Sequence, residues 1–168
     1  MLYIYGDSHA RISFKNLKLP YRDCSESSIT MFRIGRDNII INFNKNEIKQ
    51  NDVLVLVYGE VDCRCHIQRQ INAGNAEDDI IKELVNNYFK TIKNNIGDDN
   101  LKIIIVGVIP PTKQIDYETL HGPIRHEFPF IGTDEARVRY TNKVNILLEE
   151  MSNKITIFIL IHILIIQD

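Results

Sequence analysis

The sequence predicts an α/β fold, a three-layer α/β/α sandwich whose central sheet is mostly parallel. Three apolar runs of strand length, 2–5, 52–58 and 101–108, each end at or near a glycine. Runs this apolar are typical of strands buried on both faces, as in parallel sheets. Longer segments with helical spacing of apolar residues follow the second and third runs. We therefore expect βαβ units within a single domain, 1–168.

The first predicted helix connects the second and third strands. Asn75 is suited to cap its start, and Gly97 to follow its last turn. Its apolar residues recur every three or four positions: Ile80, Ile81, Leu84, Val85, Tyr88, Phe89, Ile92 and Ile96. This spacing predicts an amphipathic helix that covers one face of the sheet.

The second predicted helix follows the third strand and has Thr133 or Asp134 as its candidate cap. Its inward stripe contains Val138, Thr141, Val144, Leu148 and Met151. Periodicity is weaker elsewhere. We expect an extra strand near Ile29–Ile34, within the loop-rich region 11–48, and a last strand within Ile157–Ile165.

Composition and charge exclude several classes of protein. The 168 residues are 44% hydrophobic and 25% charged, enough for one sizeable core. A formal net charge of -2, with scattered Lys and Arg, predicts no nucleic-acid partner. The longest apolar stretch, 155–166, is shorter than the roughly 20 residues of a spanning helix, so we expect no membrane partner.

The start of the chain and its cysteines bear on its compartment. No secretory signal pattern follows Met1, which favours a cytoplasmic location. The three cysteines, Cys24, Cys63 and Cys65, are an odd number, so we expect no disulfide framework. Cys63, Cys65 and His66 lack the second pair of ligands that a zinc site requires, and we expect no metal.

The first candidate for chemistry is the tetrapeptide Gly6-Asp7-Ser8-His9, which follows the first strand. Ligands of parallel sheets bind at the carboxyl ends of the strands, so we expect the regions of Ser8, Glu60 and Pro110 to converge. Serine needs a base to become a nucleophile, and donors for the oxyanion. The alternative is that Gly-Asp-Ser forms only a turn.

This arrangement resembles the SGNH, or GDSL-like, hydrolases over all but the C-terminal part of the chain. Gly6-Asp7-Ser8-His9 resembles their nucleophile block, Gly35 their oxyanion glycine, and Gly59-Glu60-Val61-Asp62 their third block. The resemblance implies a flavodoxin-like sandwich with Ser8 as nucleophile. In the third block the family has an asparagine that donates to the oxyanion, whereas Val61 cannot donate.

The run Tyr58–Ile67 resembles more closely a Gly-Glu-Ile-Asp-Cys-Arg subgroup of SGNH-like proteins, some of them found near glycan-modifying enzymes. The resemblance extends to Thr30-Met31 and to the run 126–130. It implies catalytic roles for Ser8, Gly35, Glu60, Asp62 and Arg64. It implies substrate contacts for Asp7, His9 and His126.

Side-chain chemistry refines these roles. We expect Glu60 and Arg64 to form a buried carboxylate–guanidinium pair at the pocket floor, with a purely structural salt bridge as the alternative. His9 is interpreted as structural or pocket-lining, and His66 as a packed residue. His121, like His126, lies in a loop region that could rim the site.

The family's acid and base come from a late Asp-x-x-His block, and no such block follows Met151. His162 has no aspartate nearby. We interpret the atypical segment 155–168 as the result of a truncation or a frameshift ahead of that block.

Two functions are consistent with these residues. The first is an SGNH-type serine esterase that acts without a cofactor on a small-molecule or glycan ester, such as an acetyl ester. The second is a catalytically inactive or truncated relative that binds a ligand through Glu60, Asp62 and Arg64. A third interpretation, flavodoxin-like cofactor binding, lacks the Gly-rich phosphate loop that it requires. The oligomeric state stays open.

Overall fold

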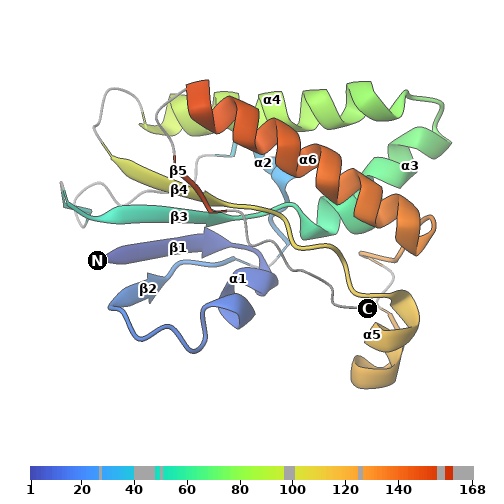
Figure 1. The fold of residues 1–168 in the computed structure, drawn as a ribbon, viewed down its shortest axis with the longest axis horizontal. Helices are drawn as coiled ribbons and strands as arrows, with labels where there is room; N and C mark the ends of the chain where they lie inside the picture. Colours follow the sequence, from blue (N-terminus) through green and yellow to red (C-terminus); the bar gives the residue numbers. More distant parts are fainter. Residues whose placement is uncertain are drawn as a thin grey trace.

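A computed structural model describes residues 1–26, 28–39, 48–49, 51–96, 101–124, 127–154 and 158–160. Its centre is a sheet of five parallel strands in the order β2-β1-β3-β4-β5 (Figure 1). Their bounds are Leu2–Gly6 for β1, Tyr21–Asp23 for β2, Val53–Val57 for β3, Lys102–Val106 for β4 and Phe158–Leu160 for β5. The predicted α/β fold and the three apolar strands are confirmed.

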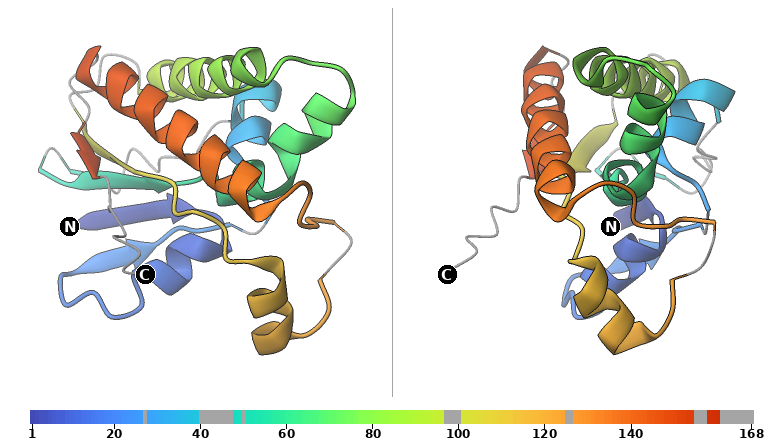
Figure 2. Two further views of the ribbon diagram at one scale, coloured as in Figure 1. Left: turned by 45° about the vertical axis from the view of Figure 1, so that its right-hand side comes forward. Right: turned by 90° about the vertical axis from the view of Figure 1, so that its right-hand side faces the viewer.

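The helices form layers on both sides of this sheet. On one side lie α2 (Met31–Asp37), α3 (Ile67–Asn72), α4 (Glu77–Ile96) and α6 (Asp134–Lys154), and on the other lies α1 (Ser8–Ser13) (Figures 1 and 2). The fold is therefore a three-layer sandwich. Helix α5 (Gln114–His121) contains no buried residue and projects from the body of the fold.

Alternate residues of the strands supply two hydrophobic cores, because successive side chains of a strand point to opposite faces. The larger core contains Leu54 and Leu56 of β3 and packs under α2, α4 and α6. The smaller contains Ile4 and Val55 and packs against Ala10 of α1. The central strands are therefore buried on both faces, which explains their continuous apolar sequence.

The two long helices begin close to their predicted starts. Thr133 caps α6, since its hydroxyl accepts a hydrogen bond from the backbone N–H of Ala136 at 3.1 Å. The prediction for α4 is wrong by one residue, because the first backbone bond runs from Ile80 to the carbonyl of Ala76. Asn75 instead donates to the side chain of Gln70. Gly97 lies outside the described residues.

The strand predicted near Ile29–Ile34 is wrong. This segment forms α2, and the additional strand is β2, which pairs with β1. Thr30 caps α2, and the distant carboxylate of Asp62 also accepts from its first two amides. Met31 and Ile34, three positions apart, face the core. A local cap and a tertiary contact therefore both hold the start of α2.

The end of the chain supplies part of the sheet. Strand β5 lies within the predicted segment Ile157–Ile165 and pairs with β4, with Ile104 opposite Phe158. The neighbouring residues of this segment lie outside the described ones. Among the helices that the structure describes, none combines the length and the apolar character needed to cross a bilayer.

Candidate active site

The carboxyl ends of β1 and β3 lie side by side, since Gly6 pairs with Val57. A Cβ atom on Gly6 would lie 2.6 Å from the carbonyl oxygen of Val57 and 2.4 Å from Cβ of Ala10. Gly59 has a φ of +119°, a backbone conformation that L side chains rarely adopt. Both strand ends therefore depend on glycine to turn the chain into the helices that carry the polar side chains.

Asp7 occupies the position between β1 and α1. Its Oδ1 accepts a hydrogen bond from the backbone N–H of His9 at 2.9 Å and so caps α1. Asp7 is 4% exposed. Its Oδ2 is shielded from solvent and has no hydrogen-bond partner among the described residues. A buried carboxylate in this state favours a positive charge beside it.

The imidazole of His9 lies between two carboxylates. Its Nδ1 is 3.0 Å from Oδ1 of Asp7, and its Nε2 is 3.3 Å from Oε2 of Glu60. Both ring nitrogens can donate only when the ring is protonated. The geometry therefore favours the imidazolium form.

The electrostatic environment acts in the same direction. Burial lowers the pKa of His9, but the hydrogen bond to Asp7 and the charges of Glu60 and Asp7 outweigh it, so the pKa lies above its usual 6.5. An imidazolium with both N–H groups engaged cannot take a proton from a serine. Within the described residues, both ring nitrogens of His9 face carboxylates, so the ring offers Ser8 no free nitrogen as a base.

Glu60 and Arg64 form the ion pair that the sequence predicts. Nε of Arg64 lies 3.0 Å from Oε1 of Glu60, and the two side chains are 10% and 12% exposed. Arg64 also donates to the carbonyl of Phe128 at 2.6 Å, and its guanidinium lies 5.0 Å from the ring centre of Phe130. Asp7, His9, Glu60 and Arg64 therefore form a row of alternating charges.

A cavity of about 230 Å³ adjoins this row. Asp7, His9 and Glu60 form its polar end, and Ser13 and Thr112 also line it. Its remaining wall is largely aliphatic, with Tyr58 and Gly107 among Ile12, Val57, Val106, Val108, Ile109, Pro110 and Pro111. The predicted convergence of the regions that follow β1, β3 and β4 is therefore confirmed.

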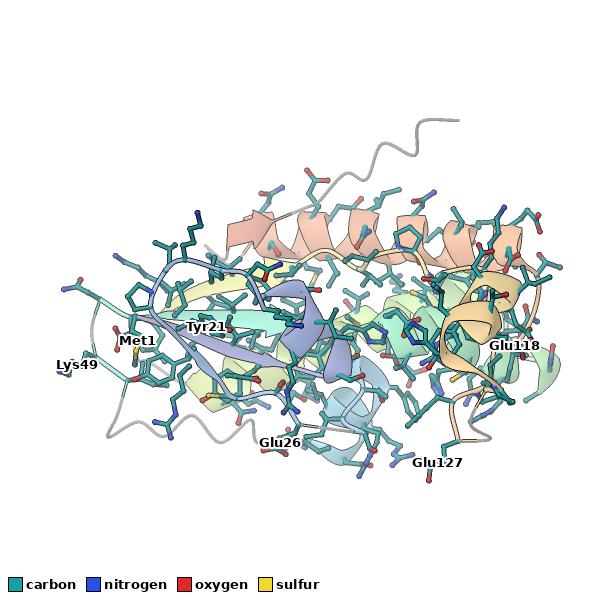
Figure 3. The ribbon with its side chains drawn as sticks, turned by 90° about the horizontal axis from the view of Figure 1, so that it is seen from below. Met1, Tyr21, Glu26, Lys49, Glu118 and Glu127 are labelled. Atoms are coloured by element: carbon teal, nitrogen blue, oxygen red, sulfur yellow. The ribbon has the colours of Figure 1, made fainter. Side chains whose placement is uncertain are left out.

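Ser8 is exposed and is not one of the residues that line this cavity, although its chain neighbours Asp7 and His9 both line it. Residues four apart share one face of a helix, so Ser8 lies one turn before Ile12, which lines the cavity. As the first residue of α1, its backbone N–H has no acceptor within the helix. Figure 3 views the fold from the side on which α1 and α5 lie.

Asp62, the first residue of the helical turn η1 (Asp62–His66), is buried completely and does not line the cavity. Its carboxylate accepts from the backbone N–H groups of Met31, at 2.9 Å, and Phe32, at 3.1 Å. Burial raises its pKa to about 7, although these two bonds lower it. The structure therefore places Asp62 as an anchor between η1 and α2.

The structure does not bring Gly35 to the cavity beside Ser8. Gly35 lies inside α2 and packs on α4, where an added Cβ would be 2.7 Å from Cβ of Asn87. An amide in this part of a helix donates to the carbonyl four residues earlier. Val61, at the position of the family's asparagine, is buried. Neither residue offers an oxyanion donor at Ser8.

A second, larger cavity of about 660 Å³ lies between α2, α3 and α4. Gly35 and His66 are part of its wall. The ring of His66 packs on Phe32 with 3.6 Å between ring centres, and burial lowers its pKa to about 4. His66 is therefore the packed residue that the sequence predicts.

The remaining histidines are not placed at the cavity. His121 is exposed at the end of α5, where its ring packs on Tyr117. His126 and His162 lie outside the described residues. Sequence reasoning missed the aliphatic wall of the cavity and the role of Phe130. The continuation of the third apolar run into Val108, Ile109 and Pro110 was the one signal that could have revealed that wall.

Comparison with known proteins adds no assignment. The chain matches no protein-family model, and no curated protein sequence matches it.

Proposed function

We propose that this protein is a serine hydrolase of the SGNH type that cleaves acyl esters, with Ser8 as the nucleophile. The observation that carries the proposal is the position of Ser8. It opens α1 at the junction of β1 and β3, where the strand order reverses, and its chain neighbours Asp7 and His9 line an aliphatic cavity with a charged end. Open α/β sheets bind their ligands at this junction.

The reaction would proceed in two steps. Oγ of Ser8 attacks the ester carbonyl carbon, the bond to the alcohol oxygen breaks, and the serine proton leaves with the alcohol. Water then attacks the acyl-serine and releases the carboxylic acid, which restores the Ser8 hydroxyl. The backbone N–H of Ser8 supports the proposal, because a free amide at the start of α1 can donate to the oxyanion.

The charged row supplies positioning in this proposal. Arg64 holds Glu60, and Glu60 and Asp7 hold His9. Because every charge in the row has a partner of opposite sign, the polar end of the cavity keeps its geometry when a neutral ester enters. The base that takes the proton from Ser8 is not among the histidines that the structure describes at the cavity.

A second candidate function, ligand binding without turnover, is favoured by one observation. Both ring nitrogens of His9 face carboxylates, so His9 offers Ser8 no free ring nitrogen as a base. Losing the base of a catalytic triad leaves only a residual rate. A protein of this kind would retain the cavity and bind the same neutral, aliphatic ligands.

Covalent labelling separates the two candidates. The protein is treated with a fluorophosphonate, which reacts with activated serines, and the intact mass is measured for the wild type, Ser8→Ala and Ser13→Ala. Ser13 is the matched control, because it lies on the same helix and lines the same cavity. We expect one label on the wild type and on Ser13→Ala, and none on Ser8→Ala. No label on any of the three would contradict the hydrolase and favour binding.

A further inference from the structure

We infer that the cavity beside Ser8 is an acyl-chain pocket, selective for straight aliphatic chains of about four to eight carbons. The inference rests on the proposed function for turnover, but the pocket itself can be tested by binding alone. Three features carry it: the size of the cavity, the chemistry of its wall and the charge at its polar end.

The size exceeds what an acetyl group needs. The cavity has a volume of about 230 Å³. A water molecule has a share of about 30 Å³ in the liquid, and a methylene group is of similar size, so the cavity holds about seven or eight such groups. An acetyl group would leave most of the aliphatic wall without contacts. A chain of four to eight carbons would fill it.

The wall is suited to a flexible chain. Val106 and Val108, at the end of β4, are 7% and 5% exposed and form its fixed part. Ile109, Pro110 and Pro111 continue the wall along the segment that leads to α5. Because the two prolines restrict the backbone, this side of the cavity is preorganised.

The polar end excludes anions. Asp7 and Glu60 present carboxylates there, and the two cations of the row, His9 and Arg64, are already paired with them. A carboxylate or phosphate ligand would meet like charges without a free cation. A neutral ester or amide meets no such penalty. The pocket therefore favours the neutral acyl ester over the free acid that forms from it.

Ile109 is the specificity-determining residue that we assign. It is half-buried, it lines the cavity, and it lies outside both cores that hold the sheet together. Ile109→Trp fills the cavity without removing a core residue. The matched control is Ile115→Trp, on α5, because Ile115 is 70% exposed and does not line the cavity.

The binding experiment uses neutral amides in place of esters, because an amide is cleaved much more slowly than the corresponding ester. Methyl NMR spectra of the protein are recorded with hexanamide, acetamide and hexanoate. We expect hexanamide to shift the methyl signals of Val106, Val108 and Ile109, and to bind at least tenfold more tightly than the other two. Ile109→Trp should lose this binding, and Ile115→Trp should keep it. Equal binding of hexanamide and acetamide would overturn the inference.

Turnover gives an independent measure. With p-nitrophenyl esters, each methylene added between acetyl and hexanoyl should raise kcat/KM about fourfold, and Ile109→Trp should abolish the rise. A kcat/KM that does not change with acyl chain length would contradict the acyl-chain pocket but not the proposed hydrolase activity. Binding of hexanamide without any labelling of Ser8 would support the acyl-chain pocket and contradict the proposed hydrolase activity.

Discussion

Replacing Asp62 by alanine should destabilise the fold strongly, although Asp62 does not line the cavity beside Ser8. Its carboxyl group accepts hydrogen bonds from two backbone N–H groups at the start of α2, that of Met31, which is buried, and that of Phe32, which is partly buried. A buried donor left without a partner costs about 1–3 kcal/mol and a partly buried one less, so the loss at pH 5 should be about 2–5 kcal/mol. Since small domains are stable by about 5–15 kcal/mol, this is a large fraction.

The pH dependence of this loss follows from the pKa of Asp62. The folded-state pKa is about 7, above the ordinary value of 3.8, because the carboxyl is buried. Between these values the folded protein holds a proton that the unfolded chain has released, so stability falls as pH rises. The contribution of Asp62 is fully present below about pH 4 and is lost through about pH 7.

Urea unfolding of the wild type, Asp62→Ala and Asp62→Asn at pH 5 and pH 7 tests both statements. The difference in the free energy of unfolding between the wild type and either variant should shrink by about 2 kcal/mol from pH 5 to pH 7, because a titrating group contributes at most about 1.4 kcal/mol per pH unit. Asp62→Asn keeps the volume and removes the titration. A difference that grows with pH, or an alanine variant as stable as the wild type, would refute the reasoning.

Two further predictions concern the strand ends and the charged row. Gly59→Ala should lower the free energy of unfolding by about 1–3 kcal/mol, which is more than Gly74→Ala should. Both glycines have a positive φ, but only at Gly59 would the added Cβ lie 2.6 Å from a side-chain carbon of Val108. Equal melting temperatures of the two variants would contradict this. NMR titration should give His9 a pKa above 6.5, and Glu60→Gln should lower it, since one carboxylate is removed. A value that does not respond to Glu60→Gln would show that the ion pair is absent in solution.

Much of the fold could be predicted because its signals are local. The apolar runs of β1, β3 and β4 are long enough to identify buried strands, and the spacing of apolar residues identified α4 and α6. The end of α4 could not be tested, since Gly97 lies outside the described residues. The start of α4 was missed by one residue, because Asn75 makes a side-chain hydrogen bond to Gln70 instead of capping the helix.

The location of the candidate site could be predicted from the sequence, but its geometry could not. Parallel strands end at one edge, so the regions of Ser8, Glu60 and Pro110 were expected to converge. The position of His9 was not predictable, because its imidazole is held by Glu60, a residue distant in the chain. Gly35 was assigned to the oxyanion by resemblance, and the structure places it in the interface between α2 and α4.

The sequence by itself determined the class of the fold and the edge of the sheet where polar residues gather, since periodicity and strand length depend on near neighbours. Tertiary structure added the carboxylate of the distant Asp62 to the local Thr30 cap at the start of α2. It also placed the imidazole of His9 between two carboxylates and made the cavity wall aliphatic. These features depend on contacts between residues far apart in the chain, and no local pattern encodes them.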